Sequence, residues 1–455
     1  MGAGQEAAAV QVGVAAEVVT PQPGGAMGGY ASRAGSSDGV LDDLFCRVVV
    51  IRQGRSVLAL VAFDLLYVPT QLVDTVAADI AAALSINTQH VLVSATHTHC
   101  GPAIAGPGST ALHQELSAAA QRCALAAERV AVPARLFHTG FSAAELVRHR
   151  REPAGTVDGT GSVLLAVSDT ADEVIASIVT MACHPTVLDG DTVAYSRDYP
   201  GVVCDTVEEI CGGQAVFFQG FAGDANPIFH DHSPGDMRLF GRQVGTRAAD
   251  AILTAQRAAR DNWTMNLSRG MKVAAPMPSV ARAVDGARLR GQVRHVQVET
   301  KEPLTADTVR AELADADHAI ASARTSAEHT TAIARRARWW IEDLMGENPP
   351  YLGVDLPSGA TSTLPVQVLT IGENLRLVAL PGEPLHGAAA RLRNALGDGV
   401  LLVGYAHRAE SYLPCLSDFD HLGYEVGSTR YQPGTVERLV EAAIDMVRDT
   451  AGGSP

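Results

Sequence analysis

The chain has 455 residues, of which 47% are hydrophobic, and its formal net charge at pH 7 is −15. This length is sufficient to bury a large core. The negative charge excludes nucleic acid and anionic membrane surfaces as expected partners. Seven cysteines occur singly and without a CxxC pair, which favours a reducing compartment and disfavours a thiolate zinc cluster.

Two segments bear on localisation. The N-terminal stretch contains Glu6 and Glu17 and has no basic region before its small apolar residues, so we expect no signal peptide. The most apolar run, residues 57–68, contains Asp64 and is too short to span a bilayer. We therefore expect a cytoplasmic protein without a membrane anchor. Self-association into a homo-oligomer stays open.

Predicted strands and helices alternate along the chain. The apolar runs that read as strands occupy residues 47–68, 90–97, 162–169, 173–185, 214–227, 365–384 and 399–408. Several of them are continuously apolar, which is typical of strands covered on both faces. Helical patterns lie between them, for example at 70–85 and 112–130. The alternation predicts an α/β fold with buried mixed β-sheets flanked by helices.

Residues 302–345 differ from the rest of the chain because they are charged, rich in alanine and free of glycine. They predict two helices that form a hairpin insertion. Stretches rich in glycine and proline at 20–39 and 346–360 predict loops. No repeat or clear linker divides the chain, so we expect residues 1–455 to form one large domain.

Polar residues of the kind that bind ligands follow four of the apolar runs. One run ends in His97-Thr98-His99, a second in His184, a third in the segment from Asp224 to Asn226, and a fourth in Glu383. Ligand sites of open α/β sheets lie beyond the carboxyl ends of their strands. The pattern therefore predicts that the two histidine-bearing strand ends and the glutamate-bearing one supply a His/His/Glu set at one site.

Two histidines and a glutamate are a ligand set that Zn²⁺ accepts, with a further position open for water. Residues i and i+2 of a strand point to the same side, so His97 and His99 are expected to face one cavity. An HxH motif is also found as an ordinary pair of hydrogen-bonded imidazoles, and Cys100 is better explained by packing than by catalysis. The coincidence at several strand ends favours the metal site.

Several segments resemble the neutral ceramidase family and occur in that family's order. They are "ATHTHCGP", "ACHPTVL", "YSRDYPG", "QGFAGDANP", "LPGEP" and "SYLPCLSDFDHLGYEVGST". The similarity extends over roughly residues 10–432. It implies the catalytic-domain fold of that family, carrying the helical insertion at 302–345 and lacking the family's C-terminal immunoglobulin-like domain.

The resemblance also implies roles for individual residues. His97, His184, Glu383 and Tyr412 match the family's zinc ligands, for one Zn²⁺ per chain. Tyr424 matches the residue that hydrogen-bonds the scissile amide, and His99 matches a histidine that faces the substrate. Arg150 matches a substrate-binding arginine, and Asp224 and Asn226 complete the candidate catalytic set.

One departure from the family changes the expected chemistry. The family's ceramidases have a serine in the segment "GDVSPN", whereas this chain has "GDANPI" with Asn226 at that place. An asparagine is no nucleophile, so the resemblance implies amide hydrolysis by attack of zinc-bound hydroxide. We expect a small N-acyl compound, lactam or peptide-like metabolite rather than a sphingolipid. Ester or lactone cleavage, amide formation or cyclisation, and a non-catalytic binding role stay open.

Overall fold

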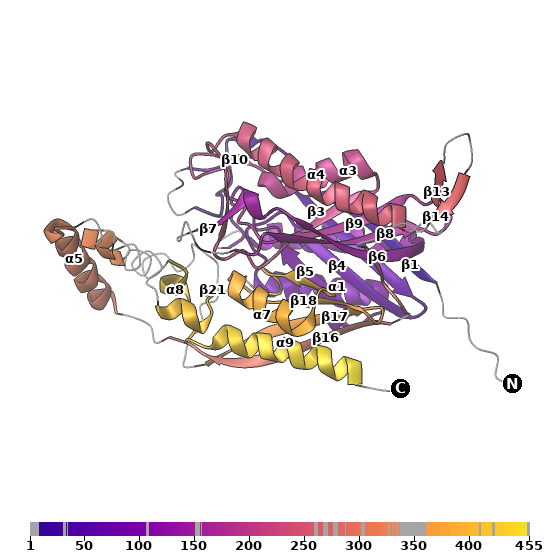
Figure 1. The fold of residues 1–455 in the computed structure, drawn as a ribbon. Coiled ribbons are helices and arrows are strands. Elements are labelled where there is room, and N and C mark those ends of the chain that lie inside the picture. Colours follow the sequence, from indigo (N-terminus) through magenta and orange to yellow (C-terminus); the bar gives the residue numbers. More distant parts are fainter. Residues whose placement is uncertain are drawn as a thin grey trace.

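The structure is a computed structural model. It describes residues 9–452 except 31–32, 34, 106–108, 151–154, 156, 259–262, 267–271, 276–280, 287, 302–304, 326–327, 330, 334, 337–360, 409–410 and 421–423. Its described part contains two main sheets, helices on the outer face of each, and several two-stranded ribbons (Figure 1). The α/β fold with buried mixed sheets is confirmed.

The larger sheet has nine strands in the order β11-β9-β8-β6-β1-β3-β4-β5, with β15 paired to β6. Their bounds are β1 Val10–Val18, β3 Phe45–Gln53, β4 Ser56–Phe63, β5 Val91–Ala95, β6 Val132–Ser142, β8 Thr160–Ser168, β9 Val174–Met181, β11 Gln214–Gln219 and β15 Arg282–Ala283. The pairs β4–β5 and β9–β11, which include the two ends of the main strand order, are parallel, and the other pairs are antiparallel.

The smaller sheet has the order β16-β17-β18-β20, and its last pair is parallel. Its strands are β16 Leu289–Glu299, β17 Thr361–Ile371, β18 Leu375–Ala379 and β20 Val400–Val403. The ribbons are β2 Gly39–Val40 with β10 Ala194–Tyr195, β7 Val147–His149 with β12 Ala225–Pro227, β13 Trp263–Asn266 with β14 Lys272–Ala275, and β19 Glu383–Pro384 with β21 Tyr412–Leu413.

Alternate side chains of a strand pack on opposite faces of the sheet, and this arrangement defines the layers of the fold. In β3, Val49 and Ile51 join the core between the two sheets, whereas Val48 and Val50 pack toward helices. Because both faces of the sheet are covered, both sets of alternate residues are apolar, and this explains the continuous apolar runs in the sequence. The result is a four-layer arrangement of helices, large sheet, small sheet and helices.

The outer helices divide between the two sheets. Helices α1 Thr70–Leu84, α2 Ser109–Arg129, α3 Asp198–Cys211 and α4 Pro234–Ala258 cover the large sheet, and α7 His386–Leu396 and α9 Thr435–Gly452 cover the small one (Figure 1). The short helix α8 Tyr424–Ser428 precedes α9. Among the described residues, no helix is both long and apolar enough to cross a membrane.

The predicted helices at 70–85 and 112–130 are confirmed as α1 and α2. The predicted insertion at 302–345 begins with helix α5 Ala306–Ser322, which stands apart from the four layers (Figure 1). Much of its second half, including residues 337–345, and the predicted loop 346–360 lie outside the described residues. The hairpin therefore stays a prediction.

Candidate metal centre

The first histidine of the candidate site lies just beyond the carboxyl end of β5. His97 is 4% exposed and has a positive φ of 68°, so the strand has already ended at this residue. The expectation that His97 and His99 share a cavity because they alternate on a strand is therefore wrong in its geometry. The two rings do lie together, 4.9 Å apart, but it is the left-handed turn at His97 that brings them there.

The second histidine lies beyond the carboxyl end of β9. His184 is fully buried, and its ring lies edge-on to that of His97 at a centroid distance of 4.9 Å. The Nδ1 atom of His184 lies 2.7 Å from the carbonyl oxygen of Ala222, and the Nδ1 atom of His97 lies 2.7 Å from that of Leu66. A carbonyl oxygen only accepts hydrogen bonds, so both Nδ1 atoms carry the proton. Each Nε2 atom therefore presents a lone pair.

The carboxylate of Glu383 faces both of these lone pairs. Its Oε2 atom lies 3.4 Å from His97 Nε2 and 3.2 Å from His184 Nε2, and the two Nε2 atoms are 3.3 Å apart. A tetrahedral zinc ion with bonds of about 2.0–2.1 Å separates its ligand atoms by about 3.3 Å. The spacing of the three atoms therefore fits a metal ion of this size.

The protonation states of the site also suit a metal. Burial lowers the pKa of His184 to about 4, and the charge of Arg150 lowers it as well, whereas the adjacent Glu383 carboxylate raises it. Burial raises the pKa of Glu383, but His97 and His184 outweigh this effect and hold that pKa well below its usual range. A neutral imidazole and an ionised carboxylate are the forms that bind a metal ion.

His99 lies next to the His97 and His184 rings. Its Nε2 atom is 3.3 Å from that of His97, and the nitrogen atoms of His97, His99 and His184 lie within 4.8 Å of one another. Its ring is only half-buried and packs against Tyr30 at 4.8 Å. Burial, followed by His97 and His184, lowers its pKa well below the usual value, so the ring is neutral. That His99 faces the substrate stays a prediction.

The predicted tyrosines and arginine meet on one side of this cluster. Tyr412 lies opposite Glu383 in the β19–β21 ribbon, and its ring is nearly parallel to that of His184 at 6.5 Å. Arg150 donates a hydrogen bond of 2.9 Å from Nη1 to the Tyr412 hydroxyl. The Arg150 guanidinium also lies 5.5 Å from the ring centroid of Tyr424, whose ring is 5.5 Å from that of Tyr412. Whether Tyr412 is a ligand stays a prediction.

Tyr405 belongs to the site but was not predicted. Its ring lies 4.0 Å from that of His97, and its hydroxyl donates a 3.5 Å hydrogen bond to Glu383 Oε2. It is buried and has a positive φ of 52°. Tyr405 comes two residues after β20, so it lies beyond the carboxyl end of a strand, as His97 and His184 do.

Asp224 and Asn226 do not join the histidine–glutamate cluster. Asp224 is buried and pairs with His386, the first residue of α7, and with His149 of β7. Asn226 lies in β12 opposite Arg148, and its Oδ1 atom is buried without a hydrogen-bond partner among the described residues. Their predicted catalytic roles stay predictions.

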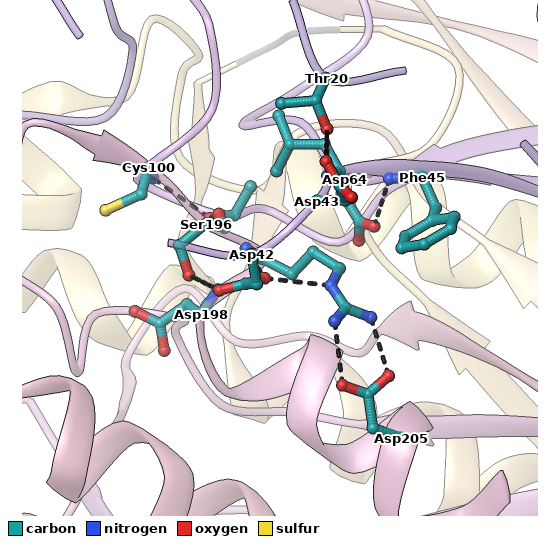
Figure 2. Close-up of polar contacts among 12 residues, drawn as sticks. Thr20, Asp42, Asp43, Phe45, Asp64, Cys100, Ser196, Asp198 and Asp205 are labelled. Atoms are coloured by element: carbon teal, nitrogen blue, oxygen red, sulfur yellow. Dashed lines mark hydrogen bonds and ion pairs between the residues drawn. The ribbon is translucent and has the colours of Figure 1, made fainter. Parts of the chain in front are cut away.

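A network of hydrogen bonds and ion pairs, drawn around Ser196 and Asp42 in Figure 2, lies next to the loop that carries His97 and His99. The hydroxyl of the buried Thr98 donates to the Ser196 carbonyl at 2.6 Å, and the Ser196 hydroxyl donates to Asp42 at 2.5 Å. Arg197 binds Asp42 at 3.0 Å and contacts Asp205 on α3 with both Nη atoms, at 2.9 and 3.0 Å. Since every member is paired, the network fixes the backbone on which the two histidines stand.

Comparison with known proteins agrees with this architecture. No family model and no curated protein sequence matches the chain. Among solved structures, the neutral ceramidase from Pseudomonas aeruginosa superimposes with a TM-score of 0.73 at 21% identity, covering 98% of this chain and 75% of that one. A ceramidase complexed with C2 gives a TM-score of 0.71 at 19% identity, covering 98% and 76%.

The fold is thus an α/β fold whose strand ends carry a His/His/Glu cluster that fits a metal ion. More specifically, the chain has the neutral-ceramidase-like fold over nearly its whole length.

Proposed function

We propose that the protein is a zinc-dependent hydrolase that cleaves the C–N amide bond of a small N-acyl, lactam or peptide-like metabolite. One observation carries the proposal: the Nε2 lone pairs of His97 and His184 and the Glu383 carboxylate converge within 3.2–3.4 Å of one another. The fold neighbours are ceramidases, and ceramide is an N-acyl amide, which supports the choice of bond.

His97, His184 and Glu383 would hold the ion, with Tyr412 beside them. A zinc ion in such a site polarises a carbonyl group and lowers the pKa of a bound water toward neutrality. The backbone carbonyls of Leu66 and Ala222 keep the two imidazoles in the tautomer that presents Nε2.

His99 and Tyr424 would act on the substrate rather than on the ion. Both are only half-buried, whereas His97 and His184 lie beneath the surface. A hydrogen bond from either side chain would stabilise the oxyanion that forms when water attacks the carbonyl. The leaving nitrogen must be protonated, and Tyr424, held near Arg150, would donate on that side.

The nature of residue 226 favours direct attack by water over a covalent enzyme intermediate. Asn226 has no nucleophilic atom, and its β12 strand positions the side chain by pairing with β7. The substrate is proposed to be small because a net charge of −15 opposes residence on an anionic membrane surface, where a lipid substrate would be presented.

A screen of N-acyl amines, lactams and short peptides, with and without a chelator, tests the proposal. We expect chelator-sensitive release of an amine that returns on addition of Zn²⁺. Each amide should be paired with its ester counterpart to distinguish amide from ester or lactone cleavage. Turnover that is unaffected by complete metal removal would contradict the proposal.

A further inference from the structure

A second group of metal-binding side chains lies beside the first site. It consists of His149 at the end of β7, Asp224 in the loop after β11, and His386 at the start of α7. One ligand atom from each of the three lies within 4.8 Å of the other two. His386 Nδ1 is in hydrogen-bond contact with Asp224 Oδ2, and His149 Nε2 lies 3.7 Å from the same oxygen.

The carboxylate of Asp224 contacts a backbone amide with one oxygen and faces two imidazoles with the other. The Oδ1 atom of Asp224 accepts the backbone N–H of His386 at 2.9 Å, which fixes the carboxylate at the N-terminus of α7. Its Oδ2 atom then faces two imidazoles whose rings are perpendicular, with centroids 5.8 Å apart.

A second carboxylate belongs to the same surroundings. Asp418 is half-buried and accepts the backbone N–H of Cys415 at 2.7 Å. Burial raises the pKa of Asp418, whereas the hydrogen bond from Cys415 lowers it. The charge of Asp224 also raises this pKa, and the charges of His386 and His149 lower it. Two imidazoles and the Asp224 carboxylate form a nitrogen–oxygen donor set that suits divalent transition metals of the zinc and cobalt type.

The two sites share two segments of backbone. The Ala222 carbonyl fixes His184 of the first site, and Asp224 of the second follows two residues later. Glu383 of the first site precedes His386 of the second by three residues, and Gly223 N–H donates to the Pro384 carbonyl at 3.0 Å. A cation in the second site would therefore tie together the segments that hold the first.

We propose that His149, Asp224 and His386 form a second divalent transition-metal site, distinct from the His97/His184/Glu383 site. Binding of an ion requires the hydrogen-bond contact between His386 and Asp224 to open and the half-buried His149 ring to turn toward the same ion. The second ion acts on structure by crosslinking β7, the loop at Asp224 and α7.

Metal counting on the full chain tests the second site. The purified protein is equilibrated with Co²⁺, freed of unbound ion, and analysed for cobalt per chain and for visible absorption. We expect about two ions in the unsubstituted protein, about one in His386→Asn and in His149→Asn, and about one in His184→Ala. Asparagine at 386 keeps an N–H donor for Asp224 and is a poor metal ligand, so a merely structural Asp–His pair predicts no loss of cobalt.

His318→Ala is the matched control, because His318 lies exposed on α5 and belongs to no candidate metal-binding group among the described residues. It should leave the cobalt count unchanged. One ion in the unsubstituted protein that is lost in His184→Ala and kept in His386→Asn would overturn the second site and leave the first. One ion that is lost in His386→Asn and kept in His184→Ala would support the second site and remove the basis of the proposed hydrolase.

Discussion

The Nε2 atoms of His97 and His184 lie 3.3 Å apart, and the Nδ1 atom of each ring is bound to a backbone carbonyl. These two contacts determine the tautomers, so the pair of lone pairs facing Glu383 is a consequence of backbone position. If one neutral ring instead donated a hydrogen bond from Nε2 to the other ring, its Nδ1 atom would lose the hydrogen bond to its backbone carbonyl oxygen.

Replacing His184 with alanine should remove the first ion. The variant loses a ligand and leaves Glu383 and His97 without a third partner, so metal affinity should fall by more than about 100-fold. Elemental analysis of the purified protein measures this, with circular dichroism as the check that the variant is folded. Full occupancy of both metal sites in the variant would contradict the ligand assignment.

Replacing Tyr424 with phenylalanine should leave metal content unchanged and slow amide turnover by about tenfold or more. Its ring packing against Tyr412 and Arg150 is kept, and only the hydroxyl is lost. Once a substrate is known, kcat and metal content are measured on the same preparation. An unchanged kcat would exclude the proposed role in protonation or oxyanion stabilisation.

Replacing Thr98 with valine should weaken the loop that carries the two histidines. Valine has the same shape, but the Ser196 carbonyl loses its 2.6 Å donor and the Cys100 N–H loses its 3.1 Å acceptor. The free energy of unfolding should fall by about 1–3 kcal/mol, because these are buried polar groups. Denaturant titration measures this loss; a stability equal to that of the unsubstituted protein would show that the network is dispensable.

Stability should fall in mild acid because His407 is buried in its neutral form. Burial, with a smaller contribution from His295, lowers the pKa of His407 to about 4. In the unfolded chain the histidine side chain has a pKa of about 6.5. Between about pH 4 and pH 6.5 the unfolded chain therefore binds more protons than the folded chain. The stability that neutral His407 contributes is therefore fully present above about pH 6.5 and is lost as the pH falls toward about 4. The free energy of unfolding should fall by about 2 kcal/mol between pH 7 and pH 5.

The variant His407→Asn isolates this effect. Asparagine does not titrate and tolerates the positive φ of 62° at this residue. Denaturant titrations at pH 7 and pH 5 should show a smaller drop in the variant than in the unsubstituted protein. Equal drops would assign the acid sensitivity to other groups.

Much of the first site could be predicted from the sequence, because ligand sites of α/β sheets lie beyond the carboxyl ends of their strands. His97, His184 and Glu383 each follow an apolar run, and the runs end at a common edge because two sheets are stacked face to face. The geometry at His97 could not be predicted, because its left-handed backbone depends on contacts such as the one to Leu66. Tyr405 also follows a strand, but a tyrosine at such a position does not indicate a site because tyrosine is a common packing residue.

The second cluster was beyond sequence reasoning. His149, Asp224 and His386 come from three distant segments, and none forms a spaced motif with another. Only the pairing of β7 with β12 and the packing of α7 against the loop at Asp224 bring them together.

The first metal site is tested by a crystal of the full chain grown with zinc, with anomalous data collected on both sides of the zinc edge. We expect a zinc peak about 2.0–2.2 Å from His97 Nε2, His184 Nε2 and a Glu383 carboxylate oxygen. An anomalous map without a peak among these three side chains, in a crystal saturated with zinc, would contradict it.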